Sequence, residues 1–178
     1  QNNFKENLKI INNQIKQIEK LVNEFSDFAR MPKPIFRKNE LNKIIQDSIN
    51  LMKINDKDII INFNSDEVYY TNSDKEQLNR VFINLFKNSI ESLKEKYEKV
   101  GNFQKKINVE IQLINDYINI VVQDNGTGFT NNDLKTLSKP YFTTKKEGSG
   151  LGLSIVEKIL NDHNGFIDFI SQNEGAKI

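Results

Sequence analysis

Two glycine-rich segments in the second half of the chain have residue types and spacings that could bind a ligand. The first follows Asp124 in the run Asp-Asn-Gly-Thr-Gly, which contains Gly126 and Gly128. An alternating apolar run precedes Asp124, so we expect its carboxylate at the end of a β-strand, where it can accept a hydrogen bond from a ligand. The two glycines can adopt a positive φ and allow backbone to approach a flat ligand closely.

The second segment contains Gly148, Gly150 and Gly152 and leads into an amphipathic helical pattern. The free N–H groups and the positive dipole end of such a helix favour an anion such as phosphate. A carboxylate for a base and a helix start for phosphates together indicate a nucleotide site. Neither a Walker nor a Rossmann motif matches, because the glycines lack a Lys-Ser/Thr ending and follow a Lys-rich loop rather than a strand. Taken alone, each segment is equally consistent with a flexible turn.

Asn84 and Asn88 are spaced to project from one side of a helix that we expect to begin near Lys75. Asp74 is a suitable N-cap for this helix, with Gln77 as its capping-box partner. Asparagine is a poor helix former, and an amide carbonyl is a hard oxygen ligand suited to Mg²⁺. We therefore expect both asparagines to serve a common ligand. The alternative is that they are incidental surface residues in an Asn-rich chain.

A regular stripe of apolar residues marks the first part of the chain and is typical of a coiled coil or helical bundle. It consists of Phe4, Leu8, Ile11, Ile15, Ile18, Val22, Phe25 and Ala29. So narrow a stripe needs another helix to bury it, from a second chain or from an upstream segment. The alternative is an ordinary surface helix that packs on its own domain. The two prolines in residues 31–34 end the helix, because proline disfavours helical geometry before it and lacks an N–H, and we place a domain boundary there.

The rest of the chain alternates between helical and strand patterns. We expect a helix over residues 41–52, strands at 59–63 and 68–70, a β-hairpin of 107–113 and 117–122, a last helix that ends at His163 with Gly165 as its αL cap, and a strand at 166–170. This order predicts an α+β fold, a two-layer sandwich in which a mixed sheet carries helices on one face.

Composition restricts the class of protein. The chain has 178 residues, no cysteine and a formal net charge of +1. The length suits one domain with an additional element, and the balanced charge does not call for nucleic acid as a partner. The lack of cysteine fits a reducing compartment, and no apolar run approaches the roughly 18 residues of a spanning helix. Because the chain begins without Met and its last residues have the pattern of a strand start, we expect a fragment of a longer protein.

Four segments resemble, in this order, the nucleotide-binding boxes of the ATP-binding domain of bacterial sensor histidine kinases, within the superfamily that includes gyrase, Hsp90 and MutL. They are Asn84-Leu-Phe-Lys-Asn88 (N box), Asp124-Asn-Gly126-Thr-Gly128 (G1 box), Tyr141-Phe142-Thr143-Thr144-Lys145 (F box) and Gly148-Ser-Gly150-Leu151-Gly152 (G2 box). Residues 25–34 resemble the exit from the dimerisation domain in NtrY-type nitrogen-regulation sensors. The resemblance implies that residues 1–34 are the second helix of a dimerisation domain and residues 35–178 the catalytic ATP-binding domain.

The resemblance also implies a role for each box. Asp124 would bind the exocyclic amine of adenine, within a turn shaped by Gly126 and Gly128. Asn88 would ligate Mg²⁺, with Asn84 close to the same metal. The remaining residues implied in nucleotide binding belong to the lid, which Phe142 would anchor and to which Lys145 would add charge: Phe142, Thr144, Lys145, Gly148, Gly150, Leu151 and Gly152.

The activity implied is transfer of the γ-phosphoryl group of ATP, bound with Mg²⁺, to a histidine. The implied partners are a second copy of the chain, bound through the N-terminal helix, and an NtrX- or NtrC-like response regulator. The intact protein would be anchored in the bacterial inner membrane, with these residues in the cytoplasm.

Two departures from the family pattern limit what this chain is expected to do. The box that carries the phosphoacceptor histidine is absent, so we assign no catalytic residue and expect no autophosphorylation. Position 84 is Asn, where ATPases such as gyrase place the Glu that activates water, so we expect poor hydrolysis. His163 is the single histidine, and we expect it to cap a helix or lie on the surface. The alternatives are a non-catalytic nucleotide-binding or dimerisation module and an ATPase of the superfamily.

Overall fold

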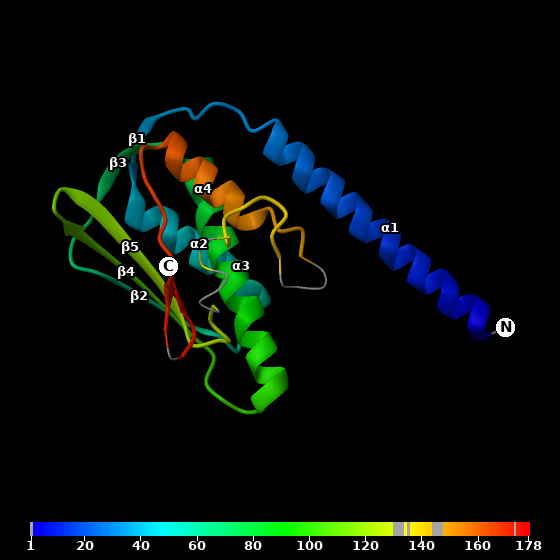
Figure 1. The fold of residues 1–178 in the computed structure, drawn as a ribbon. Helices are drawn as coiled ribbons and strands as arrows, with labels where there is room; N and C mark the ends of the chain where they lie inside the picture. The colour runs from blue at the N-terminus through cyan, green and yellow to red at the C-terminus, as the bar shows by residue number, and fades with distance from the viewer. Residues whose placement is uncertain (1, 130–133, 135, 144–147, 173) are drawn as a thin grey trace.

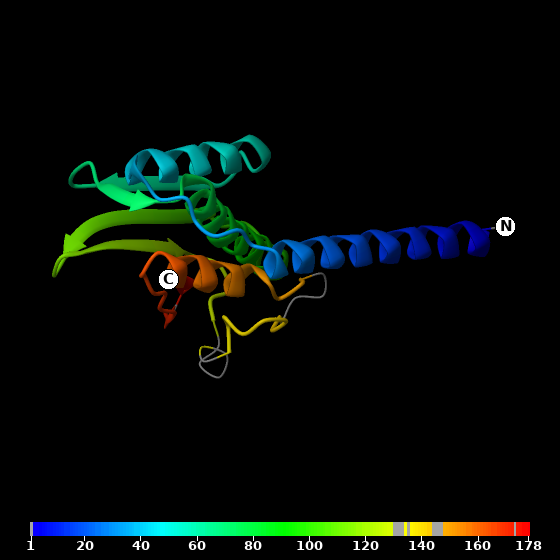
Figure 2. The same cartoon turned by 90° about the horizontal axis from the view of Figure 1, so that it is seen from above.

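The computed structural model describes residues 2–129, 134, 136–143, 148–172 and 174–178. Figure 1 shows a long N-terminal helix, α1, beside a domain of helices and strands, and Figure 2 shows this helix projecting away from that domain. Among these residues, no helix combines the length and the apolar character needed to cross a membrane.

Helix α1 spans Asn2–Ala29 and confirms the helix predicted from the apolar stripe. Its stripe is exposed along most of its length, with half or more of Ile11, Ile18 and Phe25 accessible to solvent. Among the described residues, the contact of this helix with the core is made near its end, by Phe28. The domain therefore does not bury the stripe, which rules out an ordinary surface helix packed along its own domain.

The described residues of the domain form two sheets and three further helices. The strands are β1 (Arg37–Glu40), β2 (Ile60–Ser65), β3 (Tyr70–Ser73), β4 (Lys106–Ile114), β5 (Tyr117–Asp124), β6 (Ile170–Ser171) and β7 (Ala176–Lys177), and the helices are α2 (Leu41–Asn55), α3 (Lys75–Val100) and α4 (Gly152–Asp162). The larger sheet has the order β2-β4-β5-β7-β6, while β1 and β3 pair separately. Because β2 is parallel to β4 and the other pairs are antiparallel, the larger sheet is mixed, as predicted.

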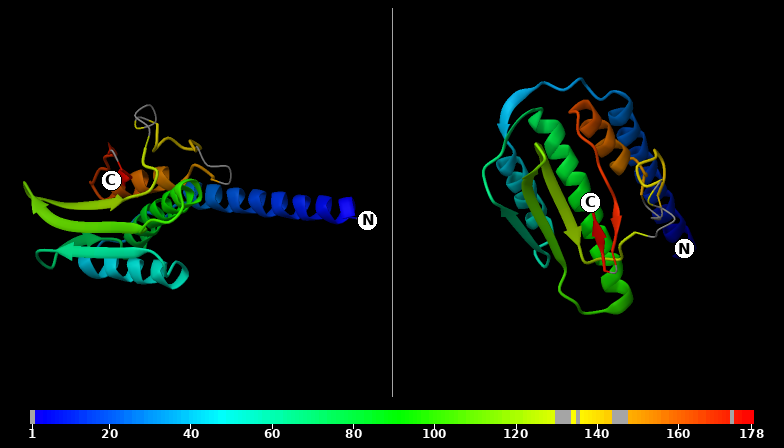
Figure 3. Two further views of the ribbon diagram at one scale, coloured as in Figure 1. Left: turned by 90° about the horizontal axis from the view of Figure 1, so that it is seen from below. Right: turned by 60° about the vertical axis from the view of Figure 1, so that its left-hand side comes forward.

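The three domain helices cover one face of the larger sheet (Figure 3). On β4, Ile107, Val109 and Ile111 point into the core beneath these helices and are almost fully buried. The alternate residues are polar and face the open side, where the side chain of Asn62 donates to that of Asn108 at 3.0 Å. This alternation is the reason for a two-layer fold, since only one face of the sheet offers apolar surface to cover.

The predicted hairpin is present, and its turn residues Asn115 and Asp116 have φ of 49° and 66°, the left-handed region that a tight hairpin turn needs. Three local predictions were wrong. The strand expected at 68–70 begins only at Tyr70, and the strand expected at 166–170 is limited to Ile170–Ser171. The αL residue after α4 is Asn164, with φ of 56°, rather than Gly165. Asparagine tolerates this conformation better than most residues, so the turn closes one position earlier.

Strand β1 was not predicted, because Arg-Lys-Asn-Glu has no apolar alternation. It exists through pairing with β3, in the register Arg37↔Ser73 to Glu40↔Tyr70. The amide of Asn39 adds a hydrogen bond to the carbonyl oxygen of Ser73 at 2.8 Å. The strand therefore depends on tertiary contacts that local sequence does not reveal.

Asp74 caps α3 as predicted, since its Oδ1 accepts a hydrogen bond from the Gln77 N–H at 3.1 Å. The reciprocal half of the capping box is absent. The side chain of Gln77 donates instead to the carbonyl oxygen of Pro32 at 2.9 Å, and the Asp74 N–H donates to Nε2 of His163 at 3.0 Å. Two distant segments thus take the contacts that a local capping box would have made.

Candidate nucleotide site

Asp124 lies at the end of β5, as predicted, and is 5% exposed. Its Oδ1 accepts a hydrogen bond from the N–H of Gly126 at 2.9 Å. A carboxylate is costly to bury without hydrogen-bond donors, and this backbone donor offsets part of that cost. The carboxyl group is therefore held in a defined orientation at the point where the strand opens into a turn.

The two glycines after Asp124 are required for different reasons. Gly128 has a φ of 73°, as expected, and lies so close to the carbonyl oxygen of Gly175 that a Cβ would overlap it. Gly126 does not have a positive φ and makes no use of this conformational freedom of glycine. A Cβ at Gly126 would overlap Oγ of Ser92 and approach Oδ1 of Asp124 to 2.9 Å. Glycine is needed there for space, because the turn packs directly on α3.

Asn84 and Asn88 are half-buried on α3. The Nδ2 of Asn84 donates to the carbonyl oxygen of Arg80 at 2.7 Å, and this hydrogen bond fixes the orientation of the amide. Its Oδ1 faces the first turn of α4, where a Cβ on Gly152 would lie 3.2 Å away. The N-box asparagine and the second glycine segment, far apart in sequence, are therefore neighbours in space.

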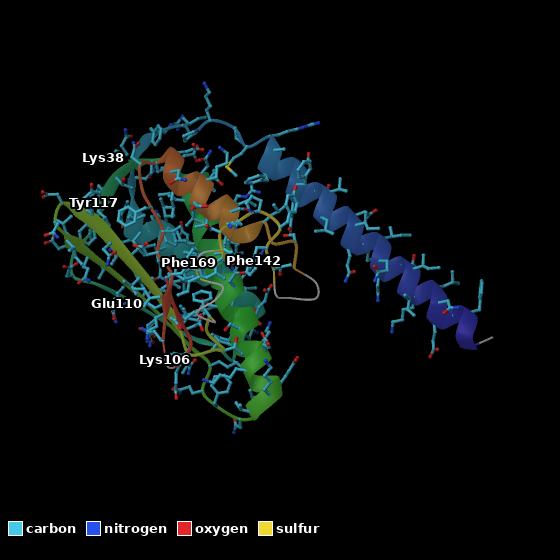
Figure 4. The ribbon with its side chains drawn as sticks, in the orientation of Figure 1. Lys38, Lys106, Glu110, Tyr117, Phe142 and Phe169 are labelled. Carbon is cyan, nitrogen blue, oxygen red and sulfur yellow. The ribbon has the colours of Figure 1, made fainter. Side chains whose placement is uncertain are left out.

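The segment that precedes α4 folds back on itself at Gly150, which has a φ of 69°. The Tyr141 N–H donates to the Gly150 carbonyl oxygen at 3.0 Å, and a Cβ at Gly150 would crowd the carbonyl oxygen of Phe142. Phe142 lies beside the start of α4 (Figure 4), and Leu151 is 1% exposed. Gly148 is half-buried in the same segment. These contacts fix the backbone at the start of the helix.

No side chain among the described residues caps the start of α4. Uncapped N–H groups at a helix start can bind phosphate oxygens, and Asn84 is the side chain of α3 that faces them. Thr144 and Lys145, the other two predicted lid residues, lie outside the described residues.

Ser92 and Lys96 contact the Asp124–Gly128 turn and were not predicted. The hydroxyl of Ser92 accepts a hydrogen bond from the Thr127 N–H at 2.9 Å, and the Lys96 ammonium donates to the carbonyl oxygen of Asn125 at 2.8 Å. The available signal was their spacing, since residues 84, 88, 92 and 96 recur every four positions on one helix.

His163 lies away from this site, at the end of α4. Its Nδ1 is 2.8 Å from the carbonyl oxygen of Ile159, and its Nε2 accepts the hydrogen bond from Asp74. This pattern corresponds to the neutral tautomer with a proton on Nδ1. Its role in the described part of the chain is to cap and join helices, as expected.

Comparisons with known proteins show the family and the fold of this chain. Residues 73–178 match the family model described as "Histidine kinase-, DNA gyrase B-, and HSP90-like ATPase". The chain is 36% identical over 177 residues to a putative sensor histidine kinase, NtrY-like, of Rickettsia conorii, covering 98% of this chain and 28% of that protein. It is 32% identical over 162 residues to nitrogen regulation protein NtrY of Azorhizobium caulinodans, covering 91% and 21%. The chain thus spans only about a quarter of the length of these relatives.

Among solved structures, the chain is similar to histidine kinase ThkA in its complex with response regulator protein TrrA. The TM-score is 0.74 at 25% identity, and the match covers 94% of this chain and 47% of that one.

Proposed function

The chain belongs to the family of histidine kinase-, DNA gyrase B- and HSP90-like ATPases, and from this premise we propose that it is the Mg²⁺–ATP-binding part of an NtrY-type sensor histidine kinase. One observation carries the proposal. Buried Asp124 and the uncapped start of α4 both adjoin α3, the first through Gly126 and Ser92 and the second through Asn84. A base-binding carboxylate and a phosphate-binding helix start therefore share one supporting helix.

At the adenine end, the carboxylate of Asp124 accepts a hydrogen bond from the exocyclic amine of the base. Guanine presents a carbonyl oxygen at that position, which a carboxylate repels, so Asp124 selects ATP over GTP. The burial of Asp124 supports this role, because a hydrogen bond made away from bulk water discriminates more strongly between a correct and an incorrect partner.

At the phosphate end, the N–H groups of the first turn of α4 bind phosphate oxygens. Gly152 leaves the space beside Oδ1 of Asn84 open, which a Cβ would partly fill. Amide oxygens of this kind fit Mg²⁺, which takes few protein ligands and shares phosphate oxygens, and we assign Asn88 as its ligand with Asn84 close by. No group of three or more His, Cys, Asp or Glu side chains suited to a metal is found among the described residues. When bound, Mg²⁺ neutralises phosphate charge.

The reaction of the intact protein is in-line transfer. A histidine nitrogen attacks the γ-phosphorus of ATP, the bond from that phosphorus to the bridging oxygen breaks, and ADP leaves. The residues described above hold and orient the nucleotide, so their contribution is positioning. His163 is unsuited as the acceptor, because both of its ring nitrogens are engaged in contacts within the fold. The acceptor histidine lies outside this sequence.

We assign residues 1–34 to a dimerisation domain and residues 35–178 to the catalytic domain. The exposed apolar stripe of α1 supports pairing with a second copy of the chain. The similar kinase ThkA forms a complex with a response regulator, which supports a response regulator as the partner here, and the resemblance to NtrY-type sensors implies one of NtrX or NtrC type. We place these residues on the cytoplasmic side of the bacterial inner membrane, with the intact protein anchored there, as the resemblance to NtrY-type sensors implies.

The test uses the full-length protein that contains this chain. Incubation with radiolabelled ATP should give acid-labile, base-stable phosphohistidine, and Asp124→Asn and Asn88→Ala should each lower its rate of formation by at least about tenfold, the loss expected for one hydrogen bond to a charged group. Glu110→Gln, on the exposed face of β4, is the control and should have no effect. Equal rates in all four proteins would refute the proposed site.

A further inference from the structure

We infer that Ser92 and Lys96 are positioning residues which determine how strongly Asp124 discriminates adenine from other bases. The inference rests on the proposed function, because it concerns the same nucleotide site. It adds two residues of α3 that hold the turn after Asp124 rather than the nucleotide itself. Each residue makes a hydrogen bond with a backbone atom of the turn, and these two hydrogen bonds do not depend on the side-chain conformations of Asn125 and Thr127.

Ser92 holds the far end of the turn. Its Oγ accepts the hydrogen bond from the Thr127 N–H at 2.9 Å and lies 3.2 Å from the Thr127 hydroxyl oxygen. The same Oγ occupies the position that a Cβ on Gly126 would need. The lack of a side chain at Gly126 therefore allows the turn to pack against α3, and the hydroxyl of Ser92 holds the turn there through a hydrogen bond.

Lys96 holds the near end of the turn, one helical turn further along α3. Its ammonium group donates to the carbonyl oxygen of Asn125 at 2.8 Å and lies 5.0 Å from the centre of the Phe103 ring. The ring attracts the cation and restricts where the side chain can go. A half-buried ammonium held in this way gives a stronger hydrogen bond than a freely solvated one.

The two contacts bracket the backbone that orients Asp124. The Gly126 N–H, which donates to Oδ1 of Asp124, lies between the Asn125 carbonyl and the Thr127 N–H. Removing either contact allows this peptide to rotate and the carboxylate to turn with it. Selection between an amine and a carbonyl depends on hydrogen-bond direction, so a small rotation lowers selectivity before it abolishes binding.

The turn has a second attachment that does not involve α3. The side chain of Asn125 accepts from the Lys106 N–H and donates to the Gln104 carbonyl oxygen, each at 2.9 Å. This attachment joins the turn to the start of β4 and remains when Ser92 or Lys96 is replaced. We therefore expect variants of Ser92 or Lys96 to fold, and we expect only the position of the turn after Asp124 to become less well defined.

The test compares ADP with inosine diphosphate, which carries a carbonyl where adenine has its amine. Calorimetric titration gives the ratio of the two dissociation constants for the unmodified chain, Ser92→Ala, Lys96→Met and Lys96→Arg, with Lys99→Met as a control at an exposed position of the same helix. We expect the unmodified chain to prefer ADP by about tenfold or more. The ratio should fall by about threefold or more in Ser92→Ala and Lys96→Met and should be retained in Lys96→Arg and the control.

A merely structural role would lower affinity for both nucleotides equally and leave the ratio unchanged. If the unmodified chain prefers ADP but Ser92→Ala and Lys96→Met keep its ratio, the inference is wrong while the proposed function stands. If the unmodified chain binds neither nucleotide, the proposed function fails and the inference fails with it.

Discussion

The Nε2 of His163 accepts a hydrogen bond from the backbone N–H of Asp74 at 3.0 Å, which joins the end of α4 to the start of α3. These residues are far apart in sequence. The linker between α1 and β1 is attached at the same point by Ile35 and Phe36. The Ile35 N–H donates to Oδ2 of Asp74 at 2.8 Å, and the ring of Phe36 packs edge-on against that of His163 with 5.1 Å between centroids. The linker, α3 and α4 therefore meet at one small polar junction.

Replacing His163 by alanine should lower the free energy of unfolding by about 1–3 kcal/mol, because the Asp74 N–H loses its acceptor and Phe36 loses its packing partner. Glutamine at position 163 can present an amide oxygen to the same N–H and should recover part of the loss. Urea unfolding followed by circular dichroism measures both variants. If His163→Ala and the unmodified chain unfold at the same urea concentration, the junction does not contribute to stability.

Asp74 should make the stability of the domain depend on pH in the acidic range. Burial acts to raise the pKa of its carboxyl group, but the N–H groups of Ile35, Gln77 and Glu76 outweigh this and hold the pKa below the ordinary value of 3.8. The ionised form therefore stabilises the fold fully above that ordinary value, and the contribution is lost as pH falls toward the lower pKa of the folded state.

Asp74→Asn is the matched variant for this effect, since asparagine caps a helix but does not titrate. Its free energy of unfolding, relative to the unmodified chain, should differ most above about pH 5 and converge as the pH falls below the ordinary carboxyl pKa. A difference that stays constant between about pH 3 and pH 6 would show that the carboxylate is not stabilised by the fold.

Gly126→Ala should weaken ADP binding strongly and destabilise the chain by about 1–3 kcal/mol, because the added Cβ overlaps Ser92 and crowds Asp124. Gly165→Ala is the matched control: its φ is not positive and a Cβ there would meet its nearest neighbour at an ordinary 3.5 Å. Calorimetry and thermal unfolding measure the two effects. Equal ADP affinity in both variants would show that the turn does not need to pack directly on α3.

The stripe of α1 should drive self-association. A pair of substitutions can distinguish specific helix pairing from non-specific hydrophobic association. Ile11 belongs to the stripe and Ile10 does not, yet they are 54% and 58% exposed. Ile11→Lys should weaken the dimer by about tenfold or more in sedimentation equilibrium, while Ile10→Lys should have little effect, because only a stripe residue is desolvated in a helix pair. An unmodified chain that remains monomeric at high concentration would exclude this role of the stripe.

Much of the fold was predictable because local chemistry and tertiary structure agree. Apolar periodicity predicted α1 and α3, and Asn115-Asp116 predicted the hairpin that brings Asp124 to its position. By contrast, β1 could not be predicted, because its sequence has no alternation of apolar residues. It forms through pairing with β3. The reciprocal capping contact could not be foreseen either, because the acceptor for the Asp74 N–H is the distant His163.

Candidate site residues could be chosen from the sequence where the residue type and its spacing already indicate a ligand-binding chemistry. Asp124, the asparagines of α3 and the glycines before α4 were chosen as candidates in this way, and the structure brings Asn84 next to Gly152. Ser92 and Lys96 were missed because serine and lysine are common on helix surfaces. Their role depends on where the turn after Asp124 lies against α3, and only the assembled fold shows that.

The most direct test of the account is a calorimetric titration of this chain with ADP in the presence of Mg²⁺, alongside Asp124→Asn and Glu110→Gln. Both variants change a carboxylate to an amide, but one lies at the end of β5 in the site and the other on the exposed face of β4. We predict one ADP bound per chain, with affinity unchanged in Glu110→Gln and lowered by about tenfold or more in Asp124→Asn. Absence of ADP binding, or equal affinity in the two variants, would contradict the assignment of this site.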